Sequence, residues 1–397
     1  MPSPVPEQPG LLLRDPFRYT ESILIVPPGL ARALALFDGE HTELDLRKYL
    51  SQATGEIEVS EPANQFVRAL DENGFLHSDT FFEMRDQKHK AFAAATERSP
   101  AHAGAAYPNE PEPLAEKLNV WGATSGEGGS RDLVALAAPH VSPDGGYKSY
   151  AAAYSRLRPE HASKTFVILG TSHYGRPETF GLTRKAYQTP LGLVETDQTF
   201  VDRLAEKAGD AVLMEDYCHA SEHSIEFQSV FLQHVVGSSL PEGERLRAVP
   251  ILCGPLAESL VKGELPEKNE QARRFFDVLG ELAEERRDDL IFVLGIDLAH
   301  IGRRYGDSFV ARAHEGEMTE VRRRDEERLE CVCAGDAEGF YDLVRPNGDD
   351  LRWCGYSSTY TFLRSVSGCK GKVLNYEQWN IDEQSVVSFV GAEFVRG

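Results

Sequence analysis

Three histidines in this chain each follow a short apolar run that is rich in aliphatic residues. They are His140 after residues 133–139, His173 after residues 165–172, and His300 after residues 291–299. Runs of this length, interrupted by glycine or proline, are typical of buried strands in an α/β sheet. Ligands of such sheets bind just beyond the carboxyl ends of the strands. Because imidazole is the commonest metal ligand, the pattern predicts one metal site assembled from distant parts of the sequence. The alternative is that all three are ordinary polar loop residues.

Length and composition set the class of protein. A chain of 397 residues exceeds one ordinary core, so two domains are expected. Its 63 acidic and 42 basic residues give a net charge of −21, which disfavours nucleic acid or anionic membranes as partners. A membrane helix needs an apolar stretch of about 20 residues, and no stretch of this sequence approaches that length. No signal peptide is evident at the N-terminus. Six cysteines without a CxxC pair are typical of reduced thiols and predict a cytoplasmic protein.

The chain is predicted to contain two domains joined by a helix. Residues 11–82 are expected to form a small winged-helix-like α+β domain. Its expected elements are a strand within 15–26, helices over 29–37, 43–51 (with Thr42 as N-cap) and 62–73, and a strand pair near 74–82. Residues 83–100 are charged and alanine-rich, which predicts a linking helix. In residues 101–397 strand-like and helical segments alternate, which predicts an α/β fold with a central, mostly parallel or mixed sheet flanked by helices.

A second group of candidate residues lies in the segment 219–228. His219, Glu222 and His223 form the pattern H-x-x-E-H, which in zinc proteases of inverted order supplies two ligands and a glutamate base. That chemistry needs one continuous helix, but the apolar helical run begins a few residues later, which favours a loop at His219. In that case His223 and Glu226, three residues apart, point from the start of one helix into the same crevice.

Two aspartates are candidates to support or complete the metal site. Asp297 lies three residues before His300 and is placed to orient its imidazole or accept its proton. Asp382 lies shortly before a predicted strand over 386–394. If that strand is antiparallel to its neighbours, Asp382 joins two histidines in the facial triad of non-haem Fe(II) sites. Otherwise Asp382 is a turn residue. Cys354 is expected to pack as a small apolar group.

Eight short segments, in order along the chain, together resemble the Memo family, also called AmmeMemoRadiSam system protein B. They are Ala103–Pro108, Ala138–His140, Ile168–His173, Thr189–Gly192, Glu222–Glu226, Val249–Gly254, Asp297–His300 and Leu374–Tyr376. The resemblance implies a fold like that of class III extradiol dioxygenases, which open catechol rings with non-haem Fe(II). It also implies partners, because microbial relatives occur with a radical-SAM protein and with AmmeMemoRadiSam system protein A. Animal relatives are linked to cell motility signalling and to iron or copper binding.

The resemblance also assigns roles by position. It makes His140 and His173 metal ligands, and it matches Asp297 and His300 to the family's Asp-x-x-His pair, which lines the metal-binding cleft. It matches His223 and Glu226 to the family's Glu-His-Ser-Ile-Glu element, and these four are the candidate catalytic residues. In animal relatives the third ligand is a cysteine six residues after the tyrosine of an Asn-Tyr pair. Counting six from Tyr376 gives Asp382 here. A carboxylate favours Fe(II), whereas a thiolate would favour Cu(I) or Zn²⁺.

The N-terminal segment resembles the winged-helix module of PqqD-like peptide-binding proteins. The resemblance lies in residues 26–30, Val-Pro-Pro-Gly-Leu, and in residues 36–42. The same shape can bind DNA, but residues 1–95 carry nine Lys or Arg and fifteen Asp or Glu, a net of −6. We therefore expect a peptide or protein ligand there.

Two functions remain open at this stage. In the first, the protein is a redox metalloenzyme that holds a divalent metal, Fe(II) before Cu or Zn, through His140, His173 and Asp382. His300, oriented by Asp297, then acts as acid or base. In the second, the protein is a non-catalytic adaptor that binds a peptide or protein and works with a radical-SAM partner.

Overall fold

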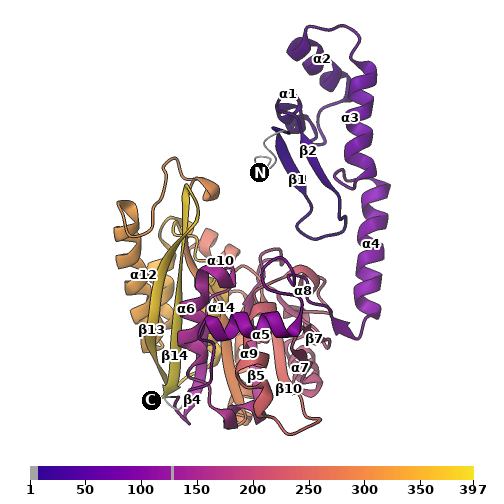
Figure 1. Ribbon diagram of the computed structural model, residues 1–397. Helices are drawn as coiled ribbons and strands as arrows, with labels where there is room; N and C mark the ends of the chain where they lie inside the picture. Colours follow the sequence, from indigo (N-terminus) through magenta and orange to yellow (C-terminus); the bar gives the residue numbers. More distant parts are fainter. Residues whose placement is uncertain (1–7, 127–128) are drawn as a thin grey trace. The chain divides into compact units, whose positions relative to one another are not determined.

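The computed structural model describes residues 8–126 and 129–397 (Figure 1). The chain divides into two compact units, one ending at Ala94 and one beginning at Ala95. In the described residues, no helix combines the length and the apolar character that crossing a lipid bilayer requires.

The first unit combines one antiparallel hairpin with a series of helices. Strand β1 (Leu11–Arg14) pairs with β2 (Ile23–Val26). The helices are α1 (Pro28–Ala31) with the short 3-10 turn Arg32–Leu36, α2 (Glu43–Thr54), α3 (Ser60–Glu72) and α4 (Asp79–Ala94). Thr42 caps α2 as predicted, because its hydroxyl accepts from the Asp45 backbone N–H and the Asp45 carboxylate accepts from the Thr42 N–H.

The strand pair predicted near residues 74–82 is wrong. Residues 79–82 are instead the first turn of α4, and the hairpin of this unit precedes its helices. From this helix Phe81 packs edge-on against Tyr19 and stacks on His77. Helix α4 also covers most of the linking helix expected over 83–100 and ends at Ala94.

The second unit is an α/β fold built on a mixed sheet. In the described residues this sheet has twelve strands. They are β3 (Glu97–Arg98), β4 (Leu133–Ala138), β5 (Thr165–Thr171), β6 (Phe180–Leu182), β7 (Ala186–Thr189), β8 (Gly192–Thr196), β9 (Val212–Met214), β10 (Leu246–Cys253), β11 (Leu290–Gly295), β12 (Asp297–Gly302), β13 (Cys369–Asp382) and β14 (Ser385–Arg396). The main path runs β12-β14-β4-β11-β5-β10-β8-β7-β3. Its centre, β4-β11-β5-β10, is parallel, and β14 is antiparallel to β4. The predicted α/β sheet is confirmed.

Helices pack around this sheet. They are α5 (Pro111–Val120), α6 (Pro143–Tyr154), α7 (Gln198–Ala208), α8 (Cys218–Ser221), α9 (Glu226–Val235), α10 (Ala257–Lys262), α11 (Glu270–Glu285), α12 (Glu317–Ala334), α13 (Ala337–Val344) and α14 (Tyr356–Ser365). Helix α14 contacts β5, β10 and β11, whereas α6 contacts β4, β13 and β14. Every residue of β5 and β11 is buried, which explains why these strands are continuous apolar runs in the sequence.

The carboxyl ends of the central strands position the candidate residues. Strand β4 ends two residues before His140, and β5 ends two residues before His173. After β11 the chain continues almost directly into β12, which contains both Asp297 and His300 and pairs antiparallel with β14. His300 therefore lies within a strand rather than in a loop after one.

Candidate metal centre

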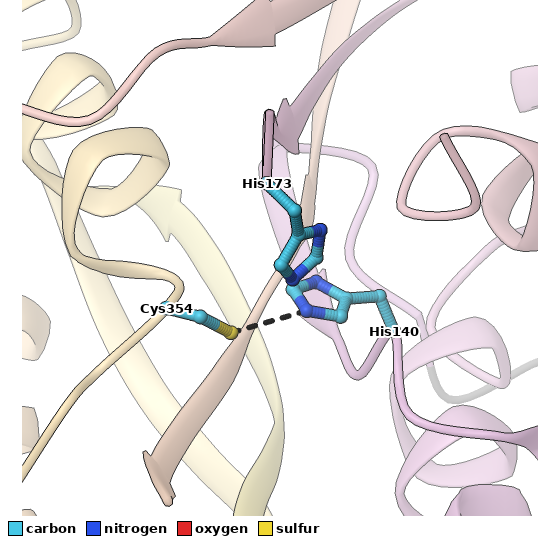
Figure 2. Close-up of side chains that lie close together, drawn as sticks. All are labelled: His140, His173 and Cys354. Carbon is cyan, nitrogen blue, oxygen red and sulfur yellow. Dashed lines mark hydrogen bonds between the residues drawn. The ribbon is translucent and has the colours of Figure 1, made fainter. Parts of the chain in front are cut away.

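His140, His173 and Cys354 each bring a ligand atom to one place (Figure 2). The three ligand atoms lie within 4.8 Å of one another. His140 Nε2 is 3.1 Å from Cys354 Sγ, and the two imidazole centroids are 5.1 Å apart. We call these three residues the ligand cluster. They come from the loop after β4, the loop after β5 and the turn before α14. Two imidazoles and one thiol form a donor set suited to a transition metal.

His140 is held in the tautomer that a metal ligand needs. Its Nδ1 lies 2.8 Å from the carbonyl oxygen of Gly295. Because a carbonyl only accepts, Nδ1 carries the proton and Nε2, which faces Cys354, is the basic nitrogen. The ring is buried, and burial together with the neighbouring His173 lowers the pKa of His140 well below its usual value. The ring is therefore neutral at physiological pH, the form that binds metals.

His173 is oriented by a buried carboxylate. Its Nδ1 lies 3.1 Å from both oxygens of Glu222, which also accept from the His173 and His223 backbone N–H groups. With Nδ1 engaged, Nε2 is the nitrogen available as a ligand. Burial disfavours a charged ring, but Glu222 outweighs burial and raises the pKa of His173. Burial likewise opposes ionisation of Glu222, yet His173 keeps the pKa of that carboxyl well below its usual value. A carboxylate that fixes a ligating histidine is the usual outer support of a metal site.

Cys354 reaches the cluster through a close backbone approach. Thr171 at the end of β5 donates its hydroxyl to the Cys354 carbonyl at 3.0 Å. The Gly355 N–H donates to the Asp297 carbonyl at 3.1 Å, and a Cβ on Gly355 would lie 2.6 Å from the Cβ of Ile296. Only glycine permits this contact. Burial, and then Asp297, raises the pKa of the Cys354 thiol well above its usual value, so metal binding must release its proton.

Asp297 and His300 adjoin the ligand cluster. Asp297 Oδ1 accepts from the backbone N–H groups of His140 and Val141, at 2.9 and 3.1 Å. Asp297, His300 and Cys354 form a second group of ligand atoms within 4.8 Å of one another. His300 Nδ1 lies 3.0 Å from the Leu298 carbonyl. Burial lowers the pKa of His300 to about 4, so this ring is neutral near pH 7.

His223 lies beside both imidazoles of the cluster, with its ring centroid 5.3 Å from that of His140. Its ring stacks on His173 with centroids 5.0 Å apart, and His173, Glu222 and His223 form a third group of possible ligands. Two further imidazoles, those of His223 and His300, and two carboxylates, those of Glu222 and Asp297, therefore adjoin the ligand cluster.

Glu226 serves a different purpose from the one predicted. Its carboxylate forms an ion pair with Arg98, and both side chains are 1% exposed. It also accepts from the Tyr107 hydroxyl and from the Ala101 and His102 backbone N–H groups. Both oxygens are thus engaged in holding the segment after β3 against the start of α9. Among the described residues, no group of possible ligands contains Glu226.

Asp382 lies at the end of β13, in the hairpin that leads to β14. Its Oδ1 accepts from the Gln384 N–H at 2.8 Å, and its Oδ2 is 3.7 Å from Arg304 Nη1. This position matches the alternative interpretation of Asp382 as a turn residue. Within the described ranges, no group of possible ligands contains Asp382, so the structure does not bring it to His140 and His173.

The reason is the length of the hairpin. Strand β14 is antiparallel to β4 and β12, which is the direction that the prediction required. However, Phe389 lies opposite Asp297 and Ser385 lies opposite Gly302. The hairpin tip therefore extends about 13 Å past the level of Asp297, at about 3.3 Å per residue. Cys354, which we expected to be a packing residue, takes the third position, and no spacing motif in the sequence marks it.

His219 is buried away from the ligand cluster. Its Nδ1 lies 2.7 Å from the Tyr187 hydroxyl and its Nε2 lies 3.1 Å from the Gly181 carbonyl. Both ring nitrogens are therefore engaged with protein atoms. Helix α8 ends at Ser221, before Glu222 and His223, so the H-x-x-E-H pattern does not lie on one helix. The geometry does not support a zinc-protease site.

Comparison with known proteins identifies the family. A family model described as Memo-like protein matches residues 98–393. This chain belongs to the Memo-like family. A MEMO1 family protein of Aquifex aeolicus is 27% identical over 96% of this chain and 95% of the relative. A MEMO1 family protein of Methanopyrus kandleri is 28% identical over 76% of this chain and 100% of the relative. One of Pyrococcus furiosus is 31% identical over 64% of this chain and 81% of the relative.

The resemblance drawn from the eight segments is thereby confirmed for the second unit. The Memo-like match begins at residue 98, at the end of β3, and so leaves the first unit outside it. A solved structure of an uncharacterized protein from Escherichia coli K12 is 13% identical, with a TM-score of 0.41, and covers 66% of this chain and 99% of that protein.

Proposed function

We propose that this Memo-like protein binds one transition-metal ion through His140, His173 and Cys354. The observation that carries the proposal is the convergence of three ligand atoms from three distant segments, within 4.8 Å of one another. The outer contacts support it, since Gly295 and Glu222 hold the Nδ1 atoms of the two rings and leave both Nε2 atoms as ligands. Histidines in an ordinary loop would not need both of their Nδ1 atoms fixed by buried groups of the protein.

The donor set bears on the metal. Two imidazoles and a thiolate are a softer donor set than the two imidazoles and carboxylate predicted with Asp382. The affinity for copper and zinc therefore rises relative to the affinity for Fe(II). Two buried carboxylates, Glu222 and Asp297, adjoin the cluster, and their negative charge favours a divalent ion over Cu(I). We propose Fe(II) as the resident ion, with copper as its main competitor.

We further propose a redox reaction of the non-haem type, related to that of extradiol dioxygenases. A bound redox metal would supply Lewis acidity and electron transfer. The chain itself supplies an acid–base group, His300, beside the ligand cluster. His300 is neutral near pH 7, with Nδ1 held by backbone carbonyls, so its Nε2 can accept a hydrogen bond from a substrate hydroxyl. A positioned base contributes about 10²–10⁴ in rate when its pKa lies near the working pH, and the low pKa of His300 makes its contribution smaller. Glu222 fixes His223 as well as His173.

Metal analysis after anaerobic purification tests this proposal. We expect about one bound transition-metal ion per chain, and O₂ uptake when catechols are added to the Fe(II)-loaded protein. The absence of stoichiometric metal, in the protein as purified and after Fe(II) or Cu(I) is added, would overturn the metal site. Bound iron without O₂ uptake would leave the metal site in place and overturn the enzymatic reaction.

A groove in the first unit favours the second candidate function, an adaptor. It has a volume of about 670 Å³, within the range of ligand sites. Its lining combines apolar residues with charged and imidazole groups, namely Leu36, Phe37, Leu46, Val67 and Leu76 with His41, Glu43, Glu61, Arg68 and His77. Such a lining suits an apolar side chain of a peptide. Under this alternative the peptide comes from a partner, for which a radical-SAM protein and AmmeMemoRadiSam system protein A are the proposed candidates.

A further inference from the structure

A buried carboxylate outside the ligand cluster connects to two of the segments that build the site. Asp325 lies on α12 and is fully buried. Its Oδ1 accepts from Trp353 Nε1 at 2.6 Å, and its Oδ2 accepts from the Tyr376 hydroxyl at 2.8 Å and the Ser388 hydroxyl at 2.6 Å. This carboxylate is assigned no role in the proposed reaction.

The first connection leads to the thiol. Trp353 immediately precedes Cys354, so the Asp325 carboxylate anchors the side chain of the neighbouring residue. The Trp353 backbone N–H is anchored too, because it donates to Asp349 at 2.7 Å, and Asp349 is paired with the buried Arg328. The residue before the thiol is therefore held at both its backbone and its indole.

The second connection leads to β12. The Ser388 hydroxyl, which donates to Asp325, accepts from the Ala299 backbone N–H at 2.9 Å. Ala299 lies between Asp297 and His300, and Asp297 in turn accepts from the His140 backbone N–H. One carboxylate thus joins the turn that carries the thiol to the strand that supports a ligating imidazole.

We propose that Asp325 is a positioning residue, which sets the place of the Cys354 thiolate relative to His140 through Trp353 and Ser388. The inference rests on the proposed metal site. A buried carboxylate is costly for a protein to keep, and burial raises the pKa of Asp325 to about 6. Two of its three hydrogen bonds, from Trp353 and Ser388, hold residues that adjoin segments of the ligand cluster. Outer contacts of this kind are typically worth about 10–100-fold in metal affinity.

Titration of the full-length protein with Co²⁺ tests the inference, because a Co²⁺–thiolate bond has a charge-transfer band that reports on Cys354 directly. Three variants each remove one donor to Asp325. Trp353→Phe and Ser388→Ala cut the two connections to the site. Tyr376→Phe is the matched control, because Tyr376 also donates to Asp325 but does not connect it to a residue of the ligand cluster. We expect the first two to weaken Co²⁺ binding about tenfold and to shift or weaken the thiolate band at saturating Co²⁺. The control should stay within twofold of the wild type.

The outcomes are distinguishable. If the wild type shows no thiolate band with Co²⁺, the proposed metal site fails. If the wild type shows the band but Trp353→Phe and Ser388→Ala behave like Tyr376→Phe, only the positioning role is wrong. A general loss of stability would not distinguish Trp353→Phe and Ser388→Ala from Tyr376→Phe. Thermal unfolding of each variant measures that loss. Should Trp353→Phe not fold, the comparison of Ser388→Ala with Tyr376→Phe decides.

Discussion

Replacing Cys354 with serine is expected to lower metal affinity by at least about 100-fold, more than the loss of an outer contact typically does. The thiolate is the only anionic member of the ligand cluster, and a serine hydroxyl does not ionise in its place. Serine is close in size to cysteine, so the fold should persist. Metal content after equilibrium dialysis against Fe(II) or Co²⁺ measures the effect, and thermal unfolding of the metal-free protein verifies the fold.

The matched control for this experiment is Asp382→Ala. Asp382 lies in the β13–β14 hairpin beside Arg304, so its loss should leave metal affinity unchanged. The reverse pattern, with metal retained in Cys354→Ser and lost in Asp382→Ala, would contradict the structure and restore the carboxylate triad predicted from the sequence.

Replacing Arg98 with methionine is expected to destabilise the second unit by about 3–5 kcal/mol, because it leaves the Glu226 carboxylate buried without its cation. Arg98 also donates to the carbonyls of His219 and Glu222, both at 2.8 Å. Its loss should therefore also loosen the segment that carries Glu222 and weaken metal binding. Denaturant-induced unfolding followed by circular dichroism measures the change in the free energy of unfolding.

An exposed ion pair supplies the comparison. Arg273 pairs with Asp277 one turn along α11, and both side chains are more than half exposed. Exposed pairs of this kind contribute little, so Arg273→Met should leave the unfolding midpoint almost unchanged. Equal effects of the two substitutions would show that the Arg98–Glu226 pair is not the anchor that its burial indicates.

The sequence was sufficient to predict two of the three members of the ligand cluster. Buried parallel strands are continuous apolar runs, and their carboxyl ends meet at one edge of a sheet, so His140 and His173 could be expected to converge. These inferences depend only on local pattern and on a general rule of sheet geometry.

The third member of the ligand cluster could not be found in this way. Cys354 follows no strand, and its place depends on the contact of Gly355 with Ile296 and on hydrogen bonds between distant segments. For Asp382 the condition set in the sequence analysis, an antiparallel β14, is met. The register between β12 and β14 nevertheless decides how far the hairpin extends, and no local pattern encodes that register.

Glu226 shows the same limit. The apolar helical run correctly placed Glu226 at the start of a helix, but His223 lies before α9 rather than on it. Spacing also does not reveal which distant side chain a carboxylate meets. Arg98, 128 residues earlier in the chain, pairs with it in the core. The family resemblance matched the whole segment Glu222–Glu226 by position. In the structure Glu222 and Glu226 hold neighbouring groups in place, whereas His223 lies beside the ligand cluster.

The most direct test of the metal centre is to locate the ion. Crystals of the full-length protein soaked anaerobically with Fe(II) should give an anomalous difference peak at the iron edge beside His140 Nε2, His173 Nε2 and Cys354 Sγ. The expected distances are about 2.1 Å to each nitrogen and about 2.3 Å to the sulfur, as in comparable sites. A peak at Asp382 or at another carboxylate cluster, with none among these three side chains, would contradict the account.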